Sequence, residues 1–281
     1  MAARRDLPDI MGEAFGRLDL AGSPQPRGKL FSLPPEPAPG PSPREVAQRL
    51  AGLRLEGMAS RLLDQSRRPE ARGLGFVARL EDLLQAEEAR RRQRLLEDRL
   101  QRAGLAKAPP LEEVDCARSG GPEPAAVARL ARPDWLKTPR NLVFHGPTGV
   151  GKTFLATALG REMILQGFRV VYGGAARLTR ELARASSLAS QTRALRALVR
   201  ADLLIIDDLG LAQLDQDQMV FLHEVVEQRM NRRATLTIAA LPPEAWPARL
   251  GGGGLGVALT DRLDAGGWRV AWSGPSRRGR G

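Results

Sequence analysis

The chain has 281 residues, of which 42% are hydrophobic and 27% are charged, a composition that supports a packed core and excludes wholesale disorder. Basic residues outnumber acidic ones by 43 to 32, only four of the 43 are lysines, and the net charge of +11 favours a polyanionic partner, nucleic acid ahead of acidic lipid. One cysteine, two histidines and no apolar run of 18 residues exclude an intramolecular disulfide, a cysteine or histidine zinc site and a membrane-spanning helix.

Residues 1–43 are predicted to form a disordered, proline-rich leader. Eight of the chain's 21 prolines lie between positions 24 and 43, and proline cannot donate the backbone hydrogen bonds of helices and sheets. A PxxP ligand is the alternative interpretation of this segment. Acidic residues interrupt the apolar positions of residues 1–20, which is not the pattern of a signal peptide, and we therefore expect a cytoplasmic protein.

Residues 44–109 are predicted to form a small helical DNA-binding domain. Apolar residues keep helical spacing over residues 46–62 and again over a longer helix at 74–105. The segment holds 15 basic and 10 acidic residues. Glutamates beside its central arginines leave open a solvated helix held by i,i+4 ion pairs, but contact with DNA is the favoured interpretation. The candidate DNA contacts are Arg90, Arg91, Arg92 and Arg94.

Residues 110–133 are rich in proline, glycine and acidic side chains and are predicted to be a linker. From residue 134 onward, short apolar strands alternate with helical segments. We expect strands at 141–144, 169–172, 203–206, 234–239 and 268–272. This alternation predicts an α/β domain over residues 134–281, with a parallel sheet flanked by helices on both faces.

Residues 146–153 read GPTGVGKT and match the phosphate-loop pattern G-x-x-x-x-G-K-[ST] between a predicted strand and a predicted helix. The glycines allow backbone N–H groups to surround phosphates, the lysine reaches the β- and γ-phosphates, and the threonine hydroxyl binds Mg²⁺. The motif therefore predicts ATP and Mg²⁺ as cofactors, Lys152 as a catalytic residue and Thr153 as a metal ligand. The predicted nucleotide-binding residues are Gly146, Pro147, Thr148, Gly149, Val150, Gly151, Lys152 and Thr153.

A second half of the same site is predicted where an apolar strand ends in two carboxylates. Residues 203–206 are Leu-Leu-Ile-Ile, and Asp207 and Asp208 follow them. We expect Asp207 to hold Mg²⁺ and Asp208 to orient or deprotonate the attacking water. Many ATPases have glutamate at the position of Asp208. Because aspartate is shorter than glutamate, we expect slow hydrolysis.

Several motifs in fixed order resemble the IstB-like ATPases, helpers of transposases in bacterial insertion sequences and relatives of the DnaC helicase loaders. The resemblance covers residues 45–278, and all but the proline-rich leader falls within it. Its motifs, besides the phosphate loop, are LRLEGM at 53–58, PDWL at 133–136, DLLIIDDLG at 202–210, LPPEAW at 241–246 and DRL at 261–263.

This resemblance implies an AAA+ core behind a small all-helical N-terminal domain. It also implies an ATPase that forms a homo-oligomer on duplex DNA with little sequence preference and presents the target to a transposase encoded nearby. In the family, the arginine of the D-R-L motif acts on the ATP of a neighbouring subunit, and this role is carried over to Arg262. Arg277 matches the position of a second, nucleotide-sensing arginine.

Two departures from the family pattern keep other functions open. Ala239 and Ala240 stand where the family has polar residues near the γ-phosphate, and residues 251–254 are a run of glycines in place of an ordered loop. These departures favour slow hydrolysis. The alternatives to a transposition helper are a DnaC-like loader that binds a replicative helicase and a degenerate module that binds ATP and DNA with little hydrolysis.

Overall fold

A computed structural model describes residues 40–276 except 117–119, 139 and 184–186. The chain divides into two units, Met1–Ser42 and Pro43–Gly281, and the second, which is compact, carries all the elements below. The predicted leader lies outside the described residues except for positions 40–43, and so does Arg277. Within the described part of the chain, no helix is both long enough and apolar enough to cross a membrane.

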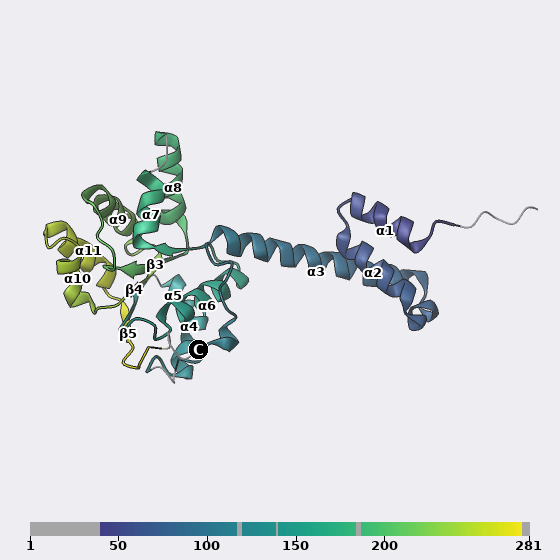
Figure 1. Cartoon of the computed structure of the whole chain (residues 1–281), viewed down its shortest axis with the longest axis horizontal. Helices are drawn as coiled ribbons and strands as arrows, with labels where there is room; N and C mark the ends of the chain where they lie inside the picture. The colour runs from purple at the N-terminus through teal and green to yellow at the C-terminus, as the bar shows by residue number, and fades with distance from the viewer. Residues whose placement is uncertain (1–39, 117–119, 139, 184–186, 277–281) are drawn as a thin grey trace, which may run out of the picture. The chain divides into compact units, whose positions relative to one another are not determined.

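Three helices open the second unit. These are α1 (Pro43–Gly52), α2 (Glu56–Arg67) and α3 (Phe76–Arg102), with a 3-10 turn at Pro69–Gly73 before α3. Helix α1 packs on α2, and α2 packs along α3 (Figure 1). The long helix is shorter than the predicted 74–105 because Gly104 takes a φ of +77°, the left-handed conformation that commonly ends a helix at glycine.

The junction of α2 and α3 accounts for the glycine of the LRLEGM motif. The backbone N–H of Gly57, in the first turn of α2, donates to Oε2 of Glu87 on α3 at 2.8 Å. A Cβ atom on Gly57 would lie 2.7 Å from the backbone of Ala86, so the close approach of the two helices requires glycine here. Burial opposes ionisation of Glu87, yet hydrogen bonds from Arg91 and from this helix N-terminus lower the pKa of the carboxyl.

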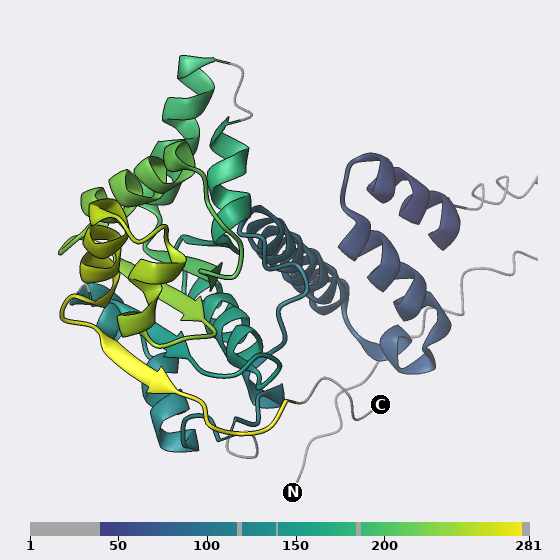
Figure 2. The ribbon, with the colours of Figure 1, turned by 60° about the vertical axis from the view of Figure 1, so that its left-hand side comes forward.

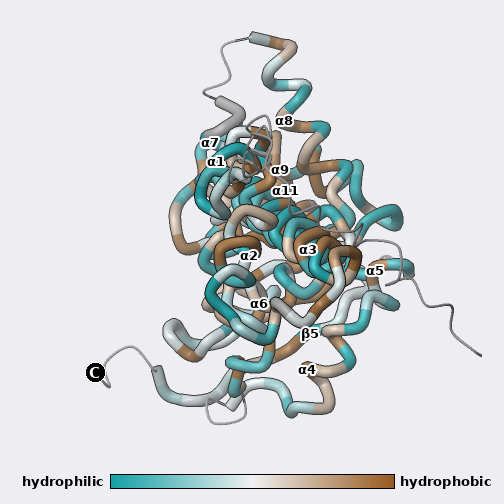
Figure 3. Tube along the Cα trace, turned by 90° about the vertical axis from the view of Figure 1, so that its right-hand side faces the viewer, coloured by the Kyte–Doolittle hydropathy of each residue, from teal (hydrophilic) through white to brown (hydrophobic). Residues whose placement is uncertain are grey.

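The first apolar stripe of α3 is more exposed than its spacing suggests. Of Phe76, Val77, Leu80, Leu83 and Leu84, only Leu83 is buried, and the side chain of Phe76 is 71% exposed. Apolar stretches of α2 and α3 appear brown in Figure 3. A helical period shows that one face of a helix is apolar, but the packing of α2 decides which of those residues are covered.

Five parallel strands form one sheet in the order β2-β3-β4-β1-β5, as the alternation of strands and helices predicts. The strands are β1 (Leu142–His145), β2 (Val170–Gly174), β3 (Leu203–Leu209), β4 (Ala234–Ala239) and β5 (Trp268–Ala271). The helices of this region are α4 (Pro124–Ala131), α5 (Asp134–Lys137), α6 (Lys152–Leu165), α7 (Ala175–Ala183), α8 (Leu188–Arg200), α9 (Gln216–Arg229), α10 (Trp246–Arg249) and α11 (Gly254–Asp264).

Helices cover both faces of the sheet (Figure 2). Alternate strand residues enter two separate apolar cores, since successive side chains of a strand point to opposite faces. Leu203 and Ile205 of β3 pack with α6 and the end of α3 in one core. Leu204 and Ile206 pack with α7, α8, α9 and α11 in the other. The continuous apolar run of β3 is thus explained by burial on both faces.

The segment 110–133, predicted to be a linker, packs against the first of these cores. It contains a short 3-10 helix, Leu111–Glu113, and helix α4. Cys116 and Leu130 are buried in the core, and Trp135, which follows in α5, donates from its indole Nε1 to the carbonyl of Leu130 at 2.9 Å. The apolar residues between the prolines and glycines of this segment pack it against α6.

Candidate functional site

The predicted phosphate loop connects the end of β1 to the start of α6. Its three glycines, Gly146, Gly149 and Gly151, have φ angles of +134°, +81° and +104°, conformations that L side chains rarely adopt. Gly151 directly precedes α6, so the loop and the unpaired N–H groups of the first helical turn face one region. A helix N-terminus joined to such a loop is a ready binding place for phosphate groups.

Lys152 is the first residue of α6, and its side chain reaches back into the phosphate loop. Its side chain is buried, and its Nζ atom donates to the carbonyl oxygens of Gly146 at 2.7 Å and Pro147 at 2.6 Å. The loop therefore already folds around a positive charge. This ammonium group is the cationic donor that the motif predicts for the phosphates.

The structure brings Thr153 and Asp207 together, although 54 positions separate them in the sequence. The Thr153 hydroxyl donates to Oδ1 of Asp207 at 3.3 Å, and Asp207 is only 3% exposed. A hydroxyl and a carboxylate beside a phosphate loop are oxygen ligands suited to Mg²⁺. Among the described residues, no group of three or more His, Cys, Asp or Glu side chains could hold a metal alone, so the remaining ligands would come from phosphates and water.

Asp208 stands at an irregular point of the sheet. The register of β3 against β4 shifts between Ile206 and Leu209, which marks a β-bulge. Asp208 has a φ of +54°, and its side chain is exposed, whereas that of Asp207 is buried. Strained backbone of this kind is concentrated at functional sites, since it aims a side chain that a regular strand would direct elsewhere.

A cavity of about 420 Å³ adjoins the phosphate loop. Gly149, Gly151, Lys152 and Thr153 form one side of it. The opposite side comes from residues that the sequence analysis did not single out, namely Gly104, Leu105, Lys107, Ala108, Pro109 and Tyr172. The chain that leaves α3 thus forms a wall of the candidate nucleotide site. No local motif identifies these residues, because they reach the cavity only through the packing of α3 against α6.

Two alanines stand at the end of β4, close to the phosphate loop in the chain's parallel sheet. Ala239 is buried at the end of β4, opposite His145 of β1, and Ala240 follows it on the surface. Neither methyl side chain can donate a hydrogen bond to a phosphate or a water molecule. Burial, followed by the nearby Arg269, lowers the pKa of His145, which keeps this residue neutral near pH 7.

Arg262 lies on α11, and its guanidinium forms an ion pair with Glu227 of α9. Its backbone carbonyl accepts a hydrogen bond from the side chain of Asn141 at 2.8 Å. In the part of the chain that the structure describes, Arg262 forms no hydrogen bond or ion pair with the phosphate loop of the same subunit.

The four arginines predicted to contact DNA are all paired with carboxylates. Arg90 and Arg94 approach Glu56 of α2 at 3.8 and 3.3 Å, Arg91 pairs with Glu87 at 2.8 Å and Arg92 with Glu88 at 3.6 Å. The pairs to Glu56 connect α3 to α2. The alternative of a helix held by ion pairs therefore describes these contacts, although pairs this exposed exchange readily with other anions.

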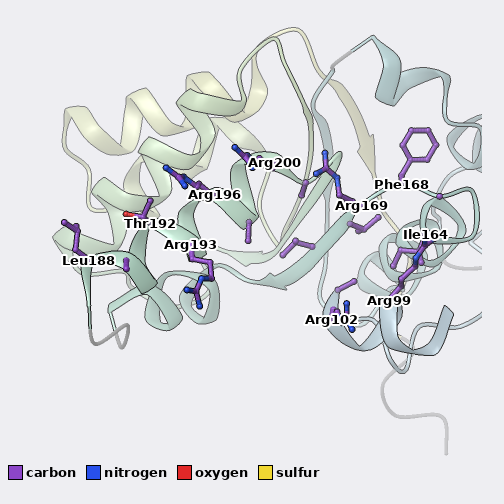
Figure 4. Close-up of a pocket in the computed structure, with 17 residues that line it drawn as sticks. Arg99, Arg102, Ile164, Phe168, Arg169, Leu188, Thr192, Arg193, Arg196 and Arg200 are labelled. Carbon is purple, nitrogen blue, oxygen red and sulfur yellow. The ribbon is translucent and has the colours of Figure 1, made fainter. Parts of the chain in front are cut away.

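A larger groove of about 1160 Å³ lies along α8, the start of β2 and the last turn of α3. None of its lining residues is acidic, and six are arginines: Arg99, Arg102, Arg169, Arg193, Arg196 and Arg200. Figure 4 shows the arginines of α8 on one side of the groove and those of α3 on the other. Arg169 approaches Asp202 at 3.5 Å, and the other five have no acidic partner among the described residues.

The sequence contains a signal for this groove in the spacing of the arginines of α8. Arg193, Arg196 and Arg200 are spaced three and four residues apart, which places them on one face of a helix. The opposite face carries Leu195 and Leu198, which pack into the second core. The helix is thus amphipathic, with an arginine face.

The fold and the site together define the class. A parallel sheet in the order β2-β3-β4-β1-β5, with a phosphate loop after β1 and acidic residues at the end of β3, is a P-loop nucleotide-binding core of the AAA+ type. The solved structure of DnaI shares this fold, with a TM-score of 0.51 and 20% identity over 62% of this chain and 93% of that one.

The chain belongs to the family of IstB-like ATP binding proteins, which it matches over residues 48–280. A relative from Pseudomonas fluorescens, described as an ATP-binding protein of insertion sequence IS1162, is 38% identical over 71% of this chain and 87% of its own length. An insertion-sequence ATP-binding protein of Sinorhizobium fredii is 34% identical over 82% of this chain and 94% of its own. These matches confirm the resemblance inferred from the motifs.

Proposed function

We propose that this chain is a cytoplasmic ATPase that binds duplex DNA and assembles on it in the presence of ATP. It would assist the transposase of its insertion sequence in selecting a target. The contact between Thr153 and Asp207 carries the ATPase part of the proposal, because it sets a hydroxyl and a carboxylate beside the phosphate loop. The insertion-sequence relatives support the transposition part.

In this proposal, Lys152 exchanges its bonds to loop carbonyls for bonds to the β- and γ-phosphates of ATP. Thr153 and Asp207 hold Mg²⁺, which would neutralise charge on the phosphates. Asp208, exposed at the bulge of β3, orients the attacking water. Binding of ATP uses the loop and the buried carboxylate, and hydrolysis adds Asp208.

Arg262 completes the site of a neighbouring subunit. Its pairing with Glu227 on α9, rather than with its own phosphate loop, supports a role outside its own subunit. An arginine supplied across a subunit boundary stabilises the charge that develops on the transferred phosphoryl group. Hydrolysis then depends on assembly.

Mixing two inactive variants tests this arrangement. Asp208→Ala and Arg262→Ala should each hydrolyse ATP at least about 100-fold more slowly than the unaltered protein, because each lacks one group of the composite site. Equal amounts of the two should recover hydrolysis, since a mixed boundary joins an intact Asp208 to an intact Arg262. The measurement is phosphate release in the presence of duplex DNA.

The matched control is Arg232→Ala, which removes an exposed arginine. Mixed with Asp208→Ala, it should hydrolyse ATP in proportion to its own amount, without added recovery. Normal hydrolysis by Arg262→Ala would contradict the role across the boundary. Hydrolysis by Asp208→Ala at the unaltered rate would contradict the role of Asp208.

A second candidate function is a degenerate module that binds ATP and DNA with little hydrolysis. The observation that favours it is the pair Ala239 and Ala240 at the end of β4, where no polar side chain is available to the γ-phosphate. Phosphate release that stays at background with DNA present, together with normal ATP binding, would select this candidate over the ATPase.

We assign DNA to the arginine groove, the groove of about 1160 Å³ that lies along α8, the start of β2 and the last turn of α3. Five of its six arginines have no acidic partner among the described residues, whereas Arg90, Arg91, Arg92 and Arg94 all have one. An unpaired guanidinium binds phosphate without first giving up a carboxylate. The four arginines of α3 remain the second candidate, in keeping with the sequence.

Replacing Arg193, Arg196 and Arg200 with Gln should weaken binding to duplex DNA and flatten its dependence on salt. The slope of log K against log salt concentration should fall by about 0.9 for each arginine that contacts a phosphate. The comparison is the variant with Arg90, Arg91, Arg92 and Arg94 replaced by Gln, which removes more charge but only paired arginines. A larger loss of slope in that comparison variant would place the DNA contact at Arg90, Arg91, Arg92 and Arg94 in the middle of α3.

A further inference from the structure

Tyr172 touches the candidate metal site from the strand next to it. Its hydroxyl donates to Oδ2 of Asp207 at 2.9 Å. The other oxygen of the same carboxylate, Oδ1, accepts from the Thr153 hydroxyl at 3.3 Å and from the backbone N–H of Asp208 at 2.8 Å. Three donors from three segments of the chain therefore fix the orientation of Asp207.

The backbone of Tyr172 is also hydrogen-bonded, through both its N–H and its carbonyl. Its N–H donates to the carbonyl of Ala103 at 2.8 Å, and its carbonyl accepts from Arg177 at 2.6 Å. Ala103 is the buried residue that follows the last turn of α3. A Cβ atom on the next residue, Gly104, would lie 2.8 Å from the Tyr172 carbonyl, so β2 and the end of α3 are in close contact here.

The phenol acts as a hydrogen-bond donor. A phenol carries its proton near neutral pH, and the Tyr172 hydroxyl directs that proton to Oδ2 of Asp207. Asp207 is thereby retained as an acceptor on Oδ2 while Oδ1 lies beside Thr153. A hydrogen bond from a neighbour to a ligating carboxylate orients it for its metal.

We propose that Tyr172 is a positioning residue, which holds Asp207 in the orientation that binds Mg²⁺ and connects that orientation to the end of α3. The inference rests on the proposed binding of ATP and Mg²⁺. It adds a contact that no phosphate-loop motif contains, because Tyr172 lies on β2 and reaches the site across the sheet, in register with β3.

Tyr172 and Ala103 also connect the candidate metal site to the arginine groove. Ala103 lines the groove together with Arg99 and Arg102 of α3, and Val171, next to Tyr172, lines it as well. The path from groove to carboxylate has two hydrogen bonds: the Tyr172 N–H donates to the Ala103 carbonyl, and the Tyr172 hydroxyl donates to Asp207. A polyanion held by Arg99 and Arg102 acts directly on the end of α3 and thus on this path.

The test compares the unaltered protein with Tyr172→Phe, which removes only the hydroxyl. The readout is the affinity for a fluorescent ATP analogue, measured in EDTA and over a Mg²⁺ titration. In EDTA, the two proteins should bind the analogue equally, since the phosphate loop is unchanged. The Mg²⁺ concentration needed for half of the gain in affinity should rise about tenfold in the variant.

Thr179→Val is the matched control. The Thr179 hydroxyl is buried, whereas Tyr172 is half-buried, and it donates at 3.0 Å to a carbonyl of its own helix and not to Asp207. This variant should keep the Mg²⁺ titration of the unaltered protein. A Tyr172→Phe titration that coincides with that of the unaltered protein would overturn the inference, and so would a loss of analogue affinity already present in EDTA.

A second arm adds duplex DNA to the titration. DNA should shift the Mg²⁺ midpoint of the unaltered protein and leave that of Tyr172→Phe in place. An unaltered protein without a DNA-dependent shift, or an equal shift in the variant, would overturn the connection to α3. Failure of the unaltered protein to bind the analogue at all would instead refute the proposed function, so the two failures are distinguishable.

Discussion

Lys152→Ala should lower the affinity for ATP by about 100-fold, a larger effect on nucleotide binding than we expect from any other single substitution. The loop folds around the Lys152 ammonium, which is buried and bonded to the carbonyls of Gly146 and Pro147. Methyl in its place leaves a phosphate without its cationic donor, and charge-assisted hydrogen bonds of this kind are about twice as strong as neutral ones. ATP-dependent assembly should be lost with binding.

The measurement is a titration with a fluorescent ATP analogue in the presence of Mg²⁺, together with a thermal melt without nucleotide. The melt should change little, because the two core clusters do not include the lysine side chain. Lys137→Ala is the matched control, since Lys137 is an exposed lysine that pairs with Asp134 on α5. Normal affinity in Lys152→Ala would place the nucleotide outside the phosphate loop.

Arg229→Met should destabilise the fold by about 3–5 kcal/mol, because it leaves several buried acceptors without a donor. Arg229 ends α9, is 1% exposed and has no carboxylate partner among the described residues. Burial, with a smaller effect of Arg233, lowers its pKa to about 9, so the group is still charged at neutral pH. Its guanidinium donates to the carbonyls of Leu198, Val199, Ala201 and Ala234 and to the hydroxyl of Thr235.

Urea unfolding measures this effect. The midpoint should fall by about 1 M or more, given the slope expected for unfolding a chain of this size. Arg232→Met, three positions on and exposed, is the matched control and should leave the midpoint unchanged. Arg229→Lys should fall between the two, since an ammonium keeps the charge but lacks the planar fork that reaches several carbonyls. An unchanged midpoint in Arg229→Met would show that water replaces the guanidinium at no cost.

The sequence predicts well those features whose local structure is determined by residues next to each other in the chain. Glycines at fixed spacing before Lys152 specify the phosphate loop, and an apolar run ending in Asp207 specifies a buried strand with a carboxylate at its end. Both predictions depend on a few consecutive residues. The contact of Thr153 with Asp207 follows once β1 and β3 lie in one parallel sheet.

The features that the sequence does not predict depend on which elements become neighbours. The pairing of Arg90 and Arg94 with Glu56 requires α2 to lie along α3, and no local pattern contains that information. The hydrogen bond from Tyr172 to Asp207 requires β2 to be next to β3. Leu130 anchors a segment whose prolines and glycines indicate a linker, because burial of a few apolar side chains outweighs an irregular backbone.

The cavity wall formed by residues 104–109 has a consequence for the exchange of parts between relatives. By sequence, these six residues belong to the connection after α3, yet Gly104, Leu105 and Lys107 face the same cavity as the phosphate loop. Recombination that grafts a foreign helical region onto this core at a junction beyond residue 109 would import a foreign surface for the nucleotide. A chimera that keeps residues 104–109 with the core would therefore keep its own nucleotide surface, and the helical region is best exchanged upstream of them.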